Sequence, residues 1–186
     1  MQGDGIIIIV SLLLSAFFSG MEIAYVSSNK IHIEIEKKQN DFLAKVLTKL
    51  TRKPSKFMAT MLIGNNIALV IYGFFMGDVL MAWFLTLLPS SSNLVTVALT
   101  DFSLLTQTII STIIILITAE FLPKVFFQIY SNTLLKFFAV PAYVFYWFFG
   151  YISSFVMWVT DVILKNFFKT EGDTVQLAFT KIELGN

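Results

Sequence analysis

The sequence has no cysteine, one histidine and few charged residues. Of its 186 residues, only 13% are charged, whereas 56% are hydrophobic. Without cysteine the chain has no disulfides and no thiolate metal ligands, and a single histidine excludes a multi-histidine zinc site. Soluble domains are about 25% charged. The composition therefore excludes an ordinary soluble domain and predicts a membrane protein.

The basic residues are unevenly distributed along the chain. Eight of the 13 lie from Lys30 to Lys56, and none occurs before Lys30 or between Phe57 and Pro123. By the positive-inside rule, residues 30–56 are cytoplasmic. The first four residues include an acid and no basic side chain, which is a poor start for a signal peptide. We therefore expect an integral protein of the inner (plasma) membrane, with its N-terminus outside and its C-terminus in the cytoplasm.

Long uncharged stretches indicate how often the chain crosses the bilayer. About 20 apolar residues suffice for one crossing, and the expected spans are about 5–26, 56–88 and 101–124. Interfacial helices are expected over about 28–52 and 134–166, the first with its lysines toward lipid headgroups. The sequence thus predicts an all-α membrane protein, with residues 1–170 as its transmembrane domain and 171–186 as a polar cytoplasmic tail.

The last apolar run, residues 137–164, has two interpretations. Lys136 and Lys165 flank it, which indicates that both of its ends are cytoplasmic. Pro141 and Gly150 interrupt it. We expect a helix lying on or dipping into the inner leaflet, and a fourth span is the alternative.

Each predicted span has a polar cluster in its cytoplasmic part. Residues Ser15, Ser19 and Glu22 fall on one face of the first helix. The second span contains Gly64-Asn65-Asn66 and the third contains Ala119-Glu120. Small serines can serve helix packing and asparagines can join helices, and Glu120 can pair with Lys124. However, a charge within the bilayer costs about 2.5–3.5 kcal/mol, so a chain that keeps one usually uses it.

Three residues after Glu120, Pro123 changes what the backbone can offer. Proline has no N–H, so a helix leaves the carbonyl of Ala119 without its usual donor. A freed carbonyl, a carboxylate, hydroxyls and amide oxygens from three helices would form an all-oxygen site. Such a site suits magnesium, calcium or sodium rather than zinc or copper.

Gly73 and Gly77 form a G-x-x-x-G pair on the second span. This pattern is typical of close helix packing. The pair can serve a dimer interface or packing within one protomer.

At these clusters the chain resembles the DUF21 transmembrane domain of the CNNM/CorC family of magnesium transporters. The matching segments are Ser19-Gly20-Met21-Glu22-Ile23-Ala24, Gly64-Asn65 and Ala119-Glu120-Phe121-Leu122-Pro123-Lys124. The resemblance implies a homodimer with three spans per protomer and export of magnesium, coupled to sodium entry. It also implies a largely dehydrated ion held by Ser15, Ser19, Asn65, Glu120 and the Ala119 carbonyl, with Gly20, Glu22, Gly64, Pro123 and Lys124 in support.

The chain departs from the family pattern at two positions and in its extent. Ala119 replaces a glycine, and Leu69 stands where many members have a second asparagine. Asn66 is therefore a candidate substitute ligand. The cytoplasmic CBS-domain pair typical of the family is not in this sequence, and we expect it in the full-length protein.

These observations favour an ion transporter over two other classes. The alternative is a membrane-embedded sensor or scaffold that binds an ion and signals through an attached CBS-type domain. An enzyme is not expected because no nucleophile–base pair is apparent. The expected partners are the lipid bilayer and a second copy, with no nucleic acid.

Overall fold

The computed structural model describes residues 2–168, and this part of the chain consists of helices and short connections without a strand. Three stretches are long and apolar enough to cross a membrane: Gln2–Ser27, Pro54–Ser90 and Ser103–Ile129. The predicted all-α fold with three membrane-spanning helices is confirmed. The predicted tail, residues 171–186, lies outside the described residues.

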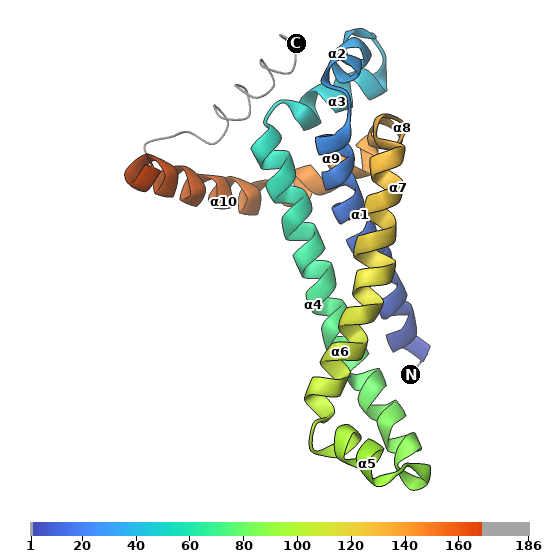
Figure 1. Ribbon diagram of the computed structural model, residues 1–186. Coiled ribbons are helices and arrows are strands. Elements are labelled where there is room, and N and C mark those ends of the chain that lie inside the picture. Colours follow the sequence, from blue (N-terminus) through green and yellow to red (C-terminus); the bar gives the residue numbers. More distant parts are fainter. Residues whose placement is uncertain (1, 169–186) are drawn as a thin grey trace.

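The first two spans are α1 (Gln2–Ser27) and α4 (Pro54–Leu87), and they pack along each other (Figure 1). At 34 residues, α4 is about 50 Å long, against about 30 Å of hydrocarbon, so it extends beyond the bilayer. It is one continuous helix that starts at Pro54, whose missing N–H is harmless in a first turn.

The third span has three parts. It runs through α6 (Ser103–Ile115), the π-helix η2 (Leu116–Phe121) and α7 (Leu122–Ile129). Both η2 and α7 pack against α1, whereas α6 packs against α4. Where α4 meets α6, a turn (η1, Leu88–Ser90) and α5 (Asn93–Thr100) close the connection over a small core of Leu80, Phe84 and Leu99.

Two short helices rich in basic residues form one end of the molecule: α2 (Lys30–Lys38) and α3 (Phe42–Thr51). Asn29 caps α2 by accepting from the N–H groups of Ile31 and His32, and Asp41 caps α3 by accepting from the N–H of Ala44. The apolar face of α3 packs inside the protein. Its central residues, Val46, Leu47 and Leu50, are buried in the core that α3 shares with α9.

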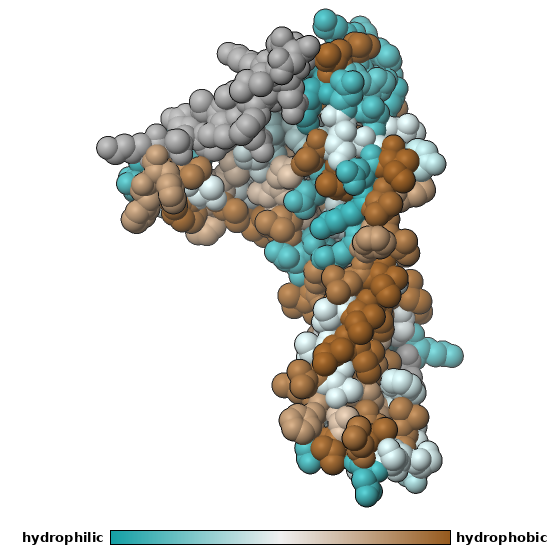
Figure 2. All heavy atoms as spheres, in the orientation of Figure 1, coloured by the Kyte–Doolittle hydropathy of each residue, from teal (hydrophilic) through white to brown (hydrophobic). Residues whose placement is uncertain are grey.

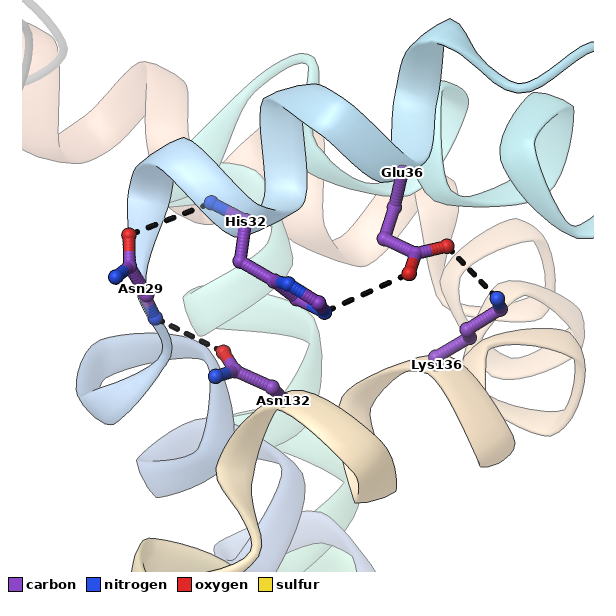
Figure 3. Close-up of polar contacts among 5 residues, drawn as sticks. All are labelled: Asn29, His32, Glu36, Asn132 and Lys136. Atoms are coloured by element: carbon purple, nitrogen blue, oxygen red, sulfur yellow. Dashed lines mark hydrogen bonds and ion pairs between the residues drawn. The ribbon is translucent and has the colours of Figure 1, made fainter.

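A polar network fastens α2 to α8 (Ser131–Phe137) (Figure 3). Lys136 donates to Glu36 at 2.7 Å, and His32 Nε2 lies 3.5 Å from the other oxygen of Glu36. The Asn29 N–H donates to Asn132 Oδ1 at 2.9 Å. The hydrogen bond to Glu36 raises the pKa of Lys136 above its usual 10.5, so this lysine stays charged in the folded protein.

The last apolar run is broken rather than straight. It forms α9 (Ala139–Phe148) and α10 (Gly150–Ile163), which continues as the π-helix η3 (Leu164–Phe168), with a bend of 74° between the two arms. In Figure 1, α10 extends sideways from the three spans. A buried hydrogen bond of 2.7 Å between Thr60 and Ser153 fixes its first turn to α4. By length and composition, the bent pair could also count as one further span.

The surface agrees with a membrane setting. Hydrophobic atoms cover most of the shaft formed by α4 and α6, and hydrophilic atoms gather over α2 and α3 (Figure 2). On this shaft Val70 is 72% exposed and Leu104 is 73% exposed. Such side chains are stable in contact with lipid and unfavourable in contact with water.

Candidate functional site

The first contact of the candidate site joins α1 to α4. Ser15 Oγ donates a 2.5 Å hydrogen bond to Asn65 Oδ1. Ser15 is fully buried and Asn65 is 8% exposed. An asparagine side chain at this depth needs a partner because lipid offers none, and Ser15 supplies it.

The second contact joins α1 to the third span one helical turn closer to α2. Ser19 Oγ donates a 2.9 Å hydrogen bond to the carbonyl oxygen of Ala119. Both residues are buried, Ser19 at 1% exposure and Ala119 at 0%. The spacing of four residues between Ser15 and Ser19 places both hydroxyls on one face of α1. Three spans thus present four oxygens along one line of contact.

The Ala119 carbonyl lies within the π-helix η2, which ends at Phe121, two residues before Pro123. The N–H of Leu122 bonds to Ile117 O, five residues back, as in a π-helix. Pro123 has no N–H to offer Ala119, four residues earlier. The helix therefore has a widened turn before Pro123. The buried Ala119 carbonyl of this turn accepts a hydrogen bond from Ser19 on another span. Single π-turns within helices are frequently found at functional sites.

Two glycines let the spans approach closely at this level. A Cβ on Gly64 would lie 2.6 Å from the Phe18 ring, and a Cβ on Gly20 would lie 2.5 Å from the Phe127 ring. The aromatic ring of Phe18 occupies the space beside Gly64. Phe18 was missed because phenylalanine is abundant here. Its position three residues after Ser15, on the same side of α1, was the available signal.

The other sequence-predicted residues surround this line of contact. Asn66 is exposed, on another side of α4 from its buried neighbour Asn65. Glu120 and Lys124 line a surface groove of about 590 Å³ along η2 and α7. Glu22 is partly buried, with Lys124 and Glu120 as its charged neighbours. The three charged side chains therefore lie near one another, and Glu120 directly follows Ala119 in the chain.

The two glycines of the G-x-x-x-G pair have different surroundings. Gly77 is buried against α6, where an added Cβ would meet Gln107 Nε2 at 2.7 Å. Gly73 is exposed, with no atom within 4 Å of an added Cβ. Gly77 thus serves packing within the protomer, and Gly73 leaves a flat place on the outer surface of α4.

The chemistry of the site follows from its donors. Within residues 2–168, there is no group of three or more His, Cys, Asp or Glu side chains that could hold a metal ion. The oxygens that converge are neutral: two hydroxyls, one amide oxygen and one backbone carbonyl. Hard neutral oxygens suit alkali and alkaline-earth cations.

Comparison with known proteins gives the family. The Cyclin M transmembrane N-terminal domain (CNNM) matches residues 6–185. A UPF0053 protein of Haemophilus influenzae is 40% identical over 62 residues, which are 33% of this chain and 15% of that protein. The chain thus matches only a small part of this longer relative. Since the family match covers nearly the whole sequence, the chain belongs to the CNNM family of membrane domains.

Proposed function

We propose that this domain binds a magnesium ion between its three spans and moves it across the membrane, with sodium entry as the driving force. One observation carries the proposal: Ser15, Ser19, Asn65 and the Ala119 carbonyl, from three different spans, meet in two buried hydrogen bonds. Membership of the CNNM family is consistent with a function related to divalent-cation transport.

The serine hydroxyls can change from donors to ligands by rotation. In the structure each hydroxyl proton points to an oxygen on another span. When a cation enters, rotation about the Cβ–Oγ bond turns the lone pairs toward the ion, and the oxygens of Asn65 and Ala119 lose their hydrogen bonds and gain the metal. Binding of the ion thus replaces two hydrogen bonds with four contacts between oxygen atoms and the metal.

The charge of the ion is offset by Glu120. Four neutral oxygens leave a double positive charge in a medium of low dielectric constant, which is unfavourable without an acid nearby. Glu120 follows Ala119 in the chain and lies at a groove, so it can turn toward the ion or toward water. Glu22 is the second acid at this level, and Asn66 stays a predicted ligand that would require α4 to rotate.

The π-helix gives the third span a way to move. A π-turn holds one residue more than an α-turn and can shift along the helix. Conversion of η2 into α-helix would rotate the Ala119 carbonyl away from Ser19 and release the ion. In this mechanism, the site faces one side of the membrane with the π-turn formed and the other side after it shifts.

Flux through reconstituted vesicles tests the proposal. The full-length protein is placed in proteoliposomes with an internal magnesium dye, and a sodium gradient is applied in either direction. We expect magnesium movement that Glu120→Gln abolishes and that Asp78→Asn preserves, since Asp78 is an exposed acid at the outer part of α4. Unchanged flux in Glu120→Gln would reject the assigned site.

The alternative is a sensor that holds the ion without moving it. The same two contacts join all three spans, so an ion there would also alter their packing. A sensor predicts magnesium-dependent thermal stabilisation that Glu120→Gln removes, together with no flux under any sodium gradient.

A further inference from the structure

A polar hollow lies at the cytoplasmic end of the molecule, away from the three-span site. It has a volume of about 290 Å³ and lies between α2 and α3. Basic side chains dominate its lining, together with three uncharged polar residues: Lys37, Lys38, Lys45, Lys49, Arg52, Gln39, Asn40 and Thr48. The described part of its wall contains no acid.

The positive charges of the hollow are largely uncompensated. Lys37 pairs with Glu34 at 3.1 Å, but Lys38, Lys45, Lys49 and Arg52 form no ion pair with any described residue. The nearest acid in the chain, Asp41, accepts a hydrogen bond from the Ala44 N–H as the cap of α3. Like charges at i and i+4, as in Lys45 and Lys49, destabilise a helix. An anion in the hollow would relieve this repulsion.

The packing of α3 fixes these cations in place. Its opposite face carries Val46, Leu47 and Leu50, which are at most 6% exposed in the protein core. With that face anchored, Lys45 and Lys49 must project outward toward α2. Hydrophilic atoms cover this end of the molecule in Figure 2. The hollow is therefore a built feature of the α2–α3 hairpin rather than a set of freely moving surface lysines.

We infer that the α2–α3 hollow binds a ligand with clustered phosphate groups. Ammonium and guanidinium groups form strong charge-assisted hydrogen bonds to phosphate oxygens, and Arg52 can do so with two parallel bonds. The amides of Gln39 and Asn40 add neutral donors. The phosphates can come from anionic lipid headgroups of the inner leaflet or from a soluble polyphosphate. Basic clusters beside the cytoplasmic end of a span attract anionic lipid by electrostatics.

Two probes distinguish these sources, both used on the purified protein in neutral detergent. One is inorganic tripolyphosphate, and the other is phosphatidylglycerol in mixed micelles, compared with phosphatidylcholine. Thermal stabilisation and its dependence on probe concentration are measured. The Lys45→Gln/Lys49→Gln variant should weaken binding about thirtyfold. Each basic side chain near an anionic surface raises the affinity about fivefold, and the two factors multiply. Lys53→Gln is the matched control, because Lys53 is exposed and outside the lining.

Each outcome decides the proposal. Stabilisation by phosphatidylglycerol alone identifies a lipid headgroup, and stabilisation by tripolyphosphate alone identifies a soluble ligand. In both cases the double variant must lose the effect, and Lys53→Gln must keep it. If neither probe stabilises the protein, or if the double variant responds like Lys53→Gln, the hollow is not a phosphate site. The assay requires no magnesium transport, so its result is independent of the function proposed above.

Discussion

Ser19 and Ala119 are 100 residues apart in the chain, and a 2.9 Å hydrogen bond joins the hydroxyl of one to the carbonyl of the other. This bond connects the first span to the π-turn of the third. It occupies the carbonyl that Pro123 leaves without a backbone donor. The contact therefore reports on both the packing of the spans and the state of the π-turn.

Replacing Ser19 with alanine should affect both stability and ion binding. The Ala119 carbonyl would be buried without its donor, which costs about 1–3 kcal/mol. We expect a lower melting temperature and a loss of magnesium-dependent stabilisation. Ser11→Ala is the control, because Ser11 is buried on the same helix two turns nearer the N-terminus. Equal responses of the two variants would contradict a special role for Ser19.

The two adjacent asparagines should differ sharply in how much their replacement by alanine destabilises the protein. Asn65→Ala leaves the buried Ser15 hydroxyl without its acceptor and should cost about 1–3 kcal/mol. Asn66→Ala changes an exposed side chain and should stay within about 0.5 kcal/mol. Denaturation in detergent measures both values. Loss of magnesium binding in Asn66→Ala would show that α4 rotates to bring Asn66 into the site.

Pro123→Ala restores a backbone N–H four residues after Ala119. The turn can then close as regular α-helix, which removes the geometric reason for η2. We expect unchanged or higher thermal stability together with weaker magnesium binding, measured on the same sample. A variant with wild-type binding would show that the π-turn does not depend on the proline.

Three glycines of the spans give a graded test of packing. Gly64→Ala forces its Cβ against the buried Phe18 ring at 2.6 Å, and overpacking of this kind costs about 1–3 kcal/mol. Gly20→Ala should behave similarly against Phe127. Gly73→Ala meets no atom and should stabilise α4 by about 1 kcal/mol, the difference in helix propensity. A destabilised Gly73→Ala would indicate that another surface, such as a second copy, packs there.

The Lys136–Glu36 contact predicts a pH dependence on the alkaline side. Because the folded protein raises the pKa of Lys136, the contact stabilises the fold fully below about 10.5, the usual value. This stabilisation is lost as the pH rises through the raised pKa of Lys136. The melting temperature of Lys136→Met should therefore lie below that of the wild type at pH 8, and the two curves should converge at high pH. Lys37→Met is the control: it removes a pair within one helix and should show a smaller difference.

The sequence was sufficient for the spans because their signal is local. A run of uncharged residues at least as long as the bilayer is thick is enough to predict a crossing. The positions of Ser15, Ser19 and Asn65 at a similar depth followed from the same counting. Depth along a helix depends only on residue number.

The direction in which each side chain points was harder to predict. Adjacent residues such as Asn65 and Asn66 differ by about 100° around a helix. Which of them faces α1 depends on how α4 is rotated, and the contact of Gly64 with Phe18 sets that rotation. What the apolar face of α3 packs against was hard to predict for a related reason, since an amphipathic helix has the same pattern whether that face meets lipid or α9.

The central proposal is a cation held between the three spans at Ser19, Asn65 and Glu120. The most direct test is a pair of high-resolution structures of the purified protein, one in magnesium and one in a chelator. We expect density in the magnesium structure within contact distance of the Ser15, Ser19 and Asn65 side-chain oxygens and the Ala119 carbonyl, absent with the chelator. Unchanged Ser15–Asn65 and Ser19–Ala119 hydrogen bonds in both structures, with no density between them, would contradict it.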